Sequence, residues 1–129
     1  MFENFVAHGF LVEDVDRAAA WYMDRMGYRA DRRTPTFVRL ETDSQAGLFL
    51  WQYAHIAAHL GAAFKEVRHR SMSAIRYERR EEVRRACDAL AGQGVRMVAP
   101  PREWEWDAYA AYFVDDDGYL WELWTWNKA

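Results

Sequence analysis

The chain has 129 residues, a hydrophobic fraction of 51% and a net charge of −3. Its length fits one compact domain with a buried core and is too short for two ordinary domains. No apolar run approaches the roughly 18 residues of a membrane-spanning helix, and the slightly acidic balance gives no electrostatic reason to expect nucleic acid as a partner. We therefore expect a single domain, residues 1–129, that neither crosses a membrane nor binds nucleic acid.

The N-terminus and the cysteine content favour a cytoplasmic location. The opening residues MFENFVAHGF carry an acidic side chain where a secretory signal carries basic ones. Cys87 is the only cysteine, so no disulfide can form within the chain. Because Cys87 lies in a helical pattern, we expect a small core residue rather than a nucleophile.

The first half of the chain predicts a strand, a helix and three further strands. Asp14 or Asp16 is available to cap the helix and Gly27 to end it. Residues 43–46 supply turn chemistry before the last of these strands. The predicted elements are a strand at 4–12, a helix at 14–27, and strands at 28–33, 36–42 and 47–53.

The same order begins again after an Ala-rich segment, residues 54–70, which predicts a short helix or an ordered connector. The second set comprises a strand at 71–78, a helix at 80–94, and strands at 95–100, 107–115 and 118–126. The βαβββ order thus occurs twice, with a period of about 65 residues. We expect two modules, residues 4–53 and 71–126, that bury their apolar sheet faces jointly.

Three stretches resemble the vicinal oxygen chelate superfamily, which includes glyoxalase I, the bleomycin resistance protein and the extradiol dioxygenases. They are LVEDVDRAAAWYMDRMGY at 11–28, ACDALAGQGV at 86–95 and FVDDDGYLWELW at 113–124. The resemblance implies an α+β fold in which two βαβββ modules form an incomplete barrel with a central cavity, commonly in a homodimer. It leaves the activity open, because this fold hosts metal enzymes and metal-free binding proteins alike.

The metal-dependent members of that superfamily use a His on the first strand, a His or Gln on the fifth strand and a Glu on the last. Glu122 matches the third ligand, but strand alternation puts Ala7 rather than His8 at the first position. Met72 falls at the second position, and Met is a poor ligand for divalent ions. We therefore expect no metal and no cofactor; His8 and Glu122 are the fallback ligands if a bulge turns His8 inward.

His55 and His59 form a second candidate metal pair, because their i, i+4 spacing on a helix can chelate zinc. No Glu lies between them as in a zincin, and the surrounding connector is surface-like. We expect solvated or capping side chains at both positions.

Aromatic residues are unusually frequent, with seven Trp, seven Tyr and seven Phe, which points to a pocket or an interface. The residues expected to bind a ligand are Phe49, Trp51, Tyr53, Met72, Arg76, Trp104, Trp106, Tyr112, Glu122 and Trp124. Alternation turns Trp126 the same way as Glu122 and turns Trp121 to the opposite face. Arg76 and Glu122 are the polar groups expected to fix a ligand's orientation. For Trp51, Trp104 and Trp124, pocket and subunit interface remain equal alternatives.

Three functions are consistent with these patterns. The first, which we favour, is a dimeric, metal-free protein of the bleomycin-resistance type that binds a planar or aromatic small molecule, such as an antibiotic, without converting it. The second is a metal-independent biosynthetic enzyme, an isomerase, cyclase or hydrolase, with Glu122 as acid or base and Tyr112 as donor. The third is a metal-dependent glyoxalase-like lyase or dioxygenase that uses Glu122 with unexpected partners.

Overall fold

The computed structural model describes residues 1–2, 5–42 and 47–127, and the βαβββ order appears in both halves. The first half contains β1 (Phe5–Val12), α1 (Val15–Met26), β2 (Arg29–Thr34), β3 (Phe37–Glu41) and β4 (Gly47–Gln52). The connection contains α2 (Tyr53–Leu60) and the 3-10 helix η1 (Gly61–Glu66). The second half contains β5 (Ser71–Arg76), α3 (Arg80–Gly92), β6 (Met97–Trp104), β7 (Ala108–Val114) and β8 (Leu120–Trp126).

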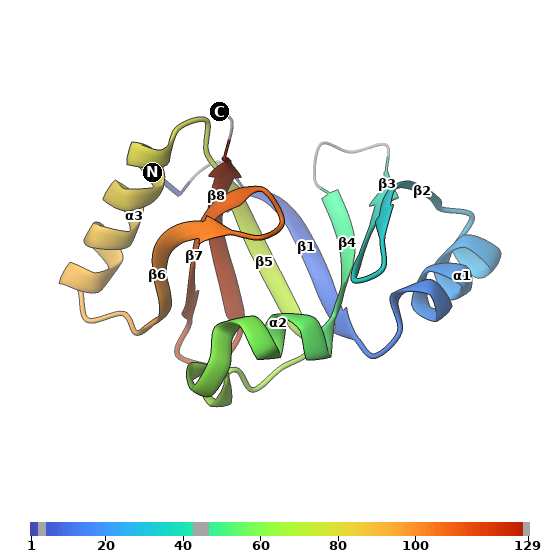
Figure 1. Ribbon diagram of the computed structural model, residues 1–129, viewed down its shortest axis with the longest axis horizontal. Helices are drawn as coiled ribbons and strands as arrows, with labels where there is room; N and C mark the ends of the chain where they lie inside the picture. The colour runs from blue at the N-terminus through green and yellow to red at the C-terminus, as the bar shows by residue number, and fades with distance from the viewer. Residues whose placement is uncertain (3–4, 43–46, 128–129) are drawn as a thin grey trace.

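One eight-stranded sheet runs through the molecule in the order β2-β3-β4-β1-β5-β8-β7-β6. The central strands β1 and β5 are antiparallel, and each is parallel to the last strand of its own half, β4 or β8. The two halves are therefore equivalent in topology, with α1 and α3 at opposite ends of the molecule and α2 below the central strands (Figure 1). Because β2 and β6 form open edges, the sheet is curled but unclosed, which confirms the predicted α+β class.

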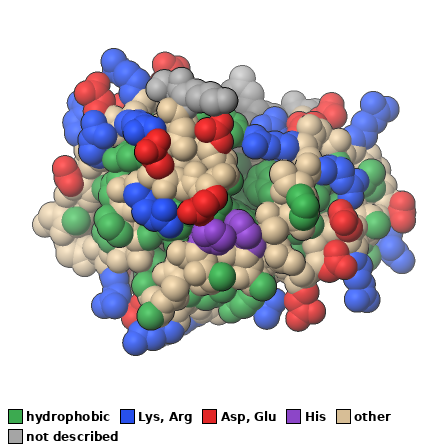
Figure 2. Space-filling model, viewed as in Figure 1, with side chains coloured by type: hydrophobic (Ala, Val, Ile, Leu, Met, Phe, Trp, Pro, Cys, Tyr) green, Lys and Arg blue, Asp and Glu red, His purple; other side chains and the backbone are tan. Residues whose placement is uncertain are grey.

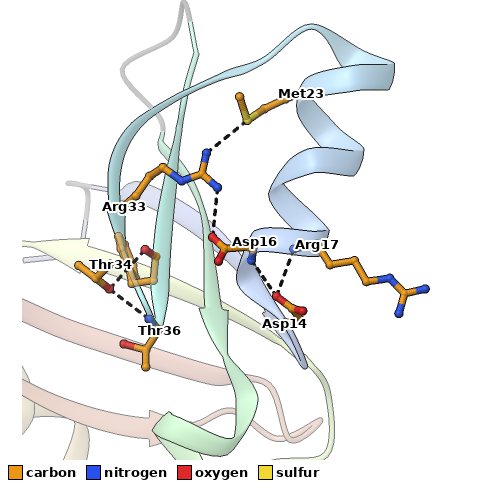
Figure 3. A network of polar contacts seen from close by, with 8 residues as sticks. Asp14, Asp16, Arg17, Met23, Arg33, Thr34 and Thr36 are labelled. Carbon is orange, nitrogen blue, oxygen red and sulfur yellow. Dashed lines mark hydrogen bonds and ion pairs between the residues drawn. The ribbon is translucent and has the colours of Figure 1, made fainter.

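Helix α1 begins and ends at the residues that its sequence predicts. The carboxylate of Asp14 accepts hydrogen bonds from the backbone N–H groups of Asp16 and Arg17 at 3.0 and 3.2 Å, which satisfies two of the free donors of the first turn (Figure 3). Gly27 ends the helix in the left-handed region, with φ of 77°.

The sheet buries apolar side chains on both faces. One cluster lies under α1 and contains Val38 and Leu50; another lies under α3 and contains Leu123 and Cys87. Cys87 is buried in this cluster, as predicted for a core residue, and burial together with the nearby charge of Asp88 raises the pKa of its thiol to about 11. The largest cluster occupies the face turned away from α1 and α3, which we call the inner face.

Two element boundaries differ from the sequence prediction. The fourth strand ends at Gln52 and Tyr53 starts α2, because Ile56 and Leu60 form an apolar stripe that packs against the inner-face cluster. Strand β6 extends to Trp104, and its register shifts between Ala99 and Arg102, where an edge strand accommodates two prolines.

Other predictions fall partly outside this description. Asn4, at the start of the first predicted strand, and the turn at 43–46 lie outside the described residues. Within the described ranges, no helix has the length and apolar character needed to cross a membrane.

Candidate functional site

A cavity of about 580 Å³ opens on the inner face of the sheet, between the two halves. The hollow is visible in Figure 2, with hydrophobic side chains inside it and His side chains at its edge. Its aromatic lining residues come from both halves and are Phe37, Phe49, Trp51, Trp106, Trp124 and Trp126. The volume falls within the range of small-molecule sites in proteins, which span roughly 300–1,000 Å³.

Strand alternation decides which side chains reach this cavity. In β8, Glu122 and Trp124 line it, whereas Trp121 packs against the cluster under α3. In β1, Ala7 lines the cavity and His8 lies on the other face, where its Nδ1 is 3.2 Å from the hydroxyl of Ser73. These orientations agree with the sequence analysis.

Of the predicted ligand-binding residues, the structure places Phe49, Trp51, Arg76, Trp106, Glu122 and Trp124 in the cavity wall. Met72, Trp104 and Tyr112 are buried beneath it, with exposed fractions of 1%, 4% and 0%. Tyr53 packs edge-on against Phe64 instead, and Arg70 lies 4.1 Å from the centre of its ring. Tyr53 begins a helix rather than continuing the strand, so it packs against the inner-face cluster without lining the cavity.

The sequence analysis missed the contribution of β2 and β3, which line the opposite wall. Their cavity residues include Asp31, Arg32, Thr34, Phe37, Arg39 and Glu41. Alternation within β3 was a usable signal, since Phe37, Arg39 and Glu41 are two residues apart. The hydrophobic pattern of a single strand does not predict the curl of the sheet, which brings the Arg32 guanidinium to 4.9 Å from the ring centre of Trp126 on β8.

Glu122, which lines the cavity, forms a buried acid pair with Tyr112, which lies beneath it. They lie directly opposite each other in the β7–β8 pair, and the Tyr112 hydroxyl donates a hydrogen bond to the Glu122 carboxylate. Burial raises the pKa of Glu122 from 4.5 to about 7, and the hydrogen bond from Tyr112 opposes this rise. Burial and the neighbouring carboxylate hold the pKa of Tyr112 well above its ordinary value. Near neutral pH Glu122 can therefore either give or take a proton.

Trp106 presents a free donor beside this pair. Its indole Nε1 is buried and has no hydrogen-bond partner among the described residues. It lies near the Tyr112 phenol, whose pKa burial and Glu122 raise and Trp106, with a smaller effect, lowers. The neighbouring Trp104, stacked at 5.0 Å, instead donates to the carbonyl of Ala110 at 2.9 Å. A buried donor without a partner is uncommon and suits a ligand acceptor.

His55 and His59 are half-buried on α2, and both make hydrogen bonds within the protein, where the sequence analysis expected solvated or capping side chains. The Trp51 indole donates to His55 Nδ1 at 3.0 Å, so a neutral His55 carries its proton on Nε2. Burial, with the neighbouring His59, lowers the pKa of His55, which lines the cavity. His59 lies between the carbonyl of His55 at 2.8 Å and the carboxylate of Glu105 at 3.0 Å.

The residues around Glu122 do not fit the metal site of the superfamily. The strand register pairs Glu122 of β8 with Ala74 of β5, and Ala74 with Ala7 of β1. Met72, which the sequence analysis placed at the ligand position of the fifth strand, pairs with Leu120 instead. Alanine offers no ligand atom. Within the described part of the chain, no three His, Cys, Asp or Glu side chains are grouped so that they could hold a metal ion, whereas such sites normally need three protein ligands.

Comparison with known proteins identifies the class. Residues 5–123 match the model of the Glyoxalase/Bleomycin resistance protein/Dioxygenase superfamily, and the chain belongs to that superfamily. A comparison with curated protein sequences found no match.

Similar solved structures support the same fold. Methylmalonyl-CoA epimerase from Mycobacterium tuberculosis is 23% identical, with a TM-score of 0.66 over 95% of this chain and 87% of the epimerase. A Legionella pneumophila structure described as NAD-dependent benzaldehyde dehydrogenase is 16% identical, with a TM-score of 0.78 over 93% and 97% of the two chains. A superfamily member from Vibrio splendidus 12B01 is 15% identical, with a TM-score of 0.59 over 94% and 97%. At these identities the likeness shows the fold alone.

Proposed function

We propose that this protein binds a planar, aromatic small molecule in its cavity without the help of a metal. The observation that carries the proposal is the aromatic wall, to which both halves contribute around a volume of about 580 Å³. Polar and charged side chains line the rest of the wall, among them Glu122, Arg76 and the arginines and carboxylates of β2 and β3. In small-molecule sites the aromatic and apolar surface supplies contact area, and placed polar groups fix the orientation of the ligand.

The aromatic side chains of the wall hold one another in place. The rings of Trp51 and Trp106 meet edge to face at 5.0 Å, and those of Trp124 and Trp126 do so at 4.8 Å. Each stacking contact to a planar ligand contributes on the order of 1 kcal/mol beyond burial. Because the rings are already ordered, less conformational entropy is lost when the ligand binds.

The proposal is tested by titrating the protein with a panel of planar aromatic compounds, using calorimetry and Trp fluorescence. We expect at least one panel member to bind, and Trp51→Ala and Trp124→Ala to weaken it by roughly 10-fold or more. Trp21→Ala is the control, since Trp21 lies on α1 with 48% of its surface exposed and outside the cavity. Absence of binding across the panel, or equal affinity in all variants, contradicts the proposal.

One observation favours a second function, acid–base catalysis on the bound molecule. The pKa of Glu122 is raised to about 7, and its carboxylate accepts a hydrogen bond from the Tyr112 hydroxyl. A general acid or base works best when its pKa is near the working pH. An acidic C–H bond in the ligand would then exchange with solvent deuterium, which mass spectrometry detects. Glu122→Gln is expected to abolish the exchange and keep the ligand affinity. If the unchanged protein binds the ligand without exchange, the catalytic function is contradicted and only the binding function stands.

A further inference from the structure

Two arginines flank one pair of indoles in the cavity. Arg32 of β2 and Arg76 of β5 both line it, although they belong to different halves of the chain. Arg76 is level with Trp124 in the β5–β8 pair, and the guanidinium of Arg32 lies 4.9 Å from the centre of the Trp126 ring. The rings of Trp124 and Trp126 are in contact, so Arg32 and the two indoles form one continuous part of the wall, with Arg76 at the level of Trp124 on the neighbouring strand.

The neighbouring arginines are already engaged with the protein. Arg33, next to Arg32 in β2, turns to the opposite face, where it lies 3.1 Å from the Asp16 carboxylate and 3.8 Å from the Met23 sulfur (Figure 3). Arg39, which lines the cavity, lies 3.2 Å from the carboxylate of Asp31.

Arg32 and Arg76 differ from these two arginines. Among the described residues, the guanidinium groups of Arg32 and Arg76 have no ion-pair or hydrogen-bond partner, so both remain available to a ligand. A guanidinium binds a carboxylate or phosphate with two parallel hydrogen bonds and also stacks on aromatic rings.

The acidic groups of the cavity leave this cationic region largely uncompensated. Asp31 is paired with Arg39, and the Glu122 carboxylate accepts a hydrogen bond from the Tyr112 hydroxyl. Glu41 is the remaining acidic side chain in the wall, and it is solvent-exposed on β3. The indoles of Trp51 and Trp106, which also line the wall, carry no charge that could balance the two arginines.

We propose that the ligand is an aromatic anion whose carboxylate, or a group of the same charge and shape, is held between Arg32 and Arg76 while its ring lies against Trp124 and Trp126. This inference rests on the proposed binding function and adds the charge of the ligand to it.

The test compares matched pairs of compounds that differ only in charge. The probes are 1-naphthoate, 2-naphthoate and anthracene-2-carboxylate, each with its neutral amide, measured by calorimetry at low salt with the full chain. We expect a carboxylate to bind about 10-fold or more tightly than its amide, as a charge-assisted hydrogen bond implies. Arg32→Gln and Arg76→Gln should each remove most of this preference, and Arg76→Lys should restore part of it. Arg33→Gln, from the neighbouring position in β2, should keep it in full.

The outcomes separate this inference from the binding function itself. If aromatic compounds bind but no carboxylate exceeds its amide, the anion inference is overturned and the aromatic site stands. A preference that survives the double Arg32→Gln, Arg76→Gln change overturns the role of the two arginines. If no compound of either series binds, the binding function and the inference both fall. Circular dichroism of each variant confirms that a lost preference does not reflect unfolding.

Discussion

The hydroxyl of Tyr112 donates a hydrogen bond to the carboxylate of Glu122 from the directly opposite position in the β7–β8 pair. Both side chains are buried: Glu122 lines the cavity, whose wall includes six Trp and Phe side chains, and Tyr112 lies beneath it. In metal-dependent members of the superfamily the last-strand Glu serves a metal; in this protein its neighbours are a phenol and two alanines. The pair therefore places a hydrogen-bonded carboxyl group, with a raised pKa, at the cavity.

The raised pKa of Glu122 predicts a specific dependence of stability on pH. Its pKa is about 7 in the folded protein against 4.5 for the free side chain. Between these values the folded state binds more protons than the unfolded state, so the free energy of unfolding falls as pH rises. The full effect of this one group is on the order of 3 kcal/mol, reached above about pH 7.

Glu122→Gln isolates this effect, because Gln still accepts the Tyr112 hydrogen bond but does not titrate. The lowered pKa of His55 acts in the opposite direction, adding stability as pH rises toward 6.5, and is common to both proteins. Urea unfolding of both proteins from pH 4.5 to 8 gives the difference. We expect the Gln variant to gain stability relative to the unchanged protein as pH increases; parallel curves would mean that Glu122 is not buried as described.

Tyr112→Phe should raise the pKa of Glu122 further, because the hydroxyl is the group that lowers it. Loss of this hydrogen bond also destabilises the protein by about 1–3 kcal/mol above neutral pH, where the carboxylate is ionised. Carbon-13 NMR of the Glu side-chain carboxyl follows the titration. Tyr109→Phe is the control. Tyr109 lies three positions before Tyr112 in β7 and packs in the cluster under α3, so its loss should leave the pKa of Glu122 unchanged.

Strand alternation made much of this site predictable from the sequence. It predicts Glu122, Trp124 and Trp126 on one face and Trp121 on the other, as the structure has them. The Tyr112–Glu122 contact depends on the register of the hairpin, which the tight turn after Val114 fixes. The depth of each side chain was not predictable, because alternation gives a face but not a distance from solvent: Tyr112 lies beneath the wall and Trp124 in it.

Gly9→Ala should destabilise the protein by about 1–3 kcal/mol through overpacking. A Cβ atom at this position would lie 2.1 Å from the ring of Phe49, which stacks on Phe37 at 5.6 Å and has little freedom to move. Gly92→Ala, at the end of α3 with no atom within 4 Å of the new Cβ, is the matched control and should be neutral or stabilising. Urea unfolding measures both, and a Gly9→Ala protein of unchanged stability would contradict the close approach of Phe49.

Trp51→Phe should raise the pKa of His55. Burial and the nearby His59 lower that pKa in the structure, and the Trp51 N–H occupies the nitrogen that protonation would use. Without this donor the imidazole takes up a proton more easily, which nitrogen-15 NMR of the ring detects. Trp121→Phe, on the other face of the sheet, serves as the control; equal His55 titration in the Trp51 and Trp121 variants would show that the hydrogen bond has no influence.

The parts of the site that sequence reasoning missed depend on contacts between distant segments. Tyr53 follows a strand pattern but starts α2, because tertiary packing of Ile56 and Leu60 overrides the local preference. The approach of Arg32 to Trp126 arises from the curl of the whole sheet, which no local pattern records.

The central claim, that the aromatic cavity is the ligand site, is tested most directly by locating a bound molecule. Nuclear Overhauser effects between a ligand of the aromatic panel and the indole protons of the protein report which Trp residues it touches. We predict contacts to Trp106 and Trp124 in the cavity and none to Trp21 or Trp121 outside it. Contacts confined to Trp21 or Trp121 would contradict the account.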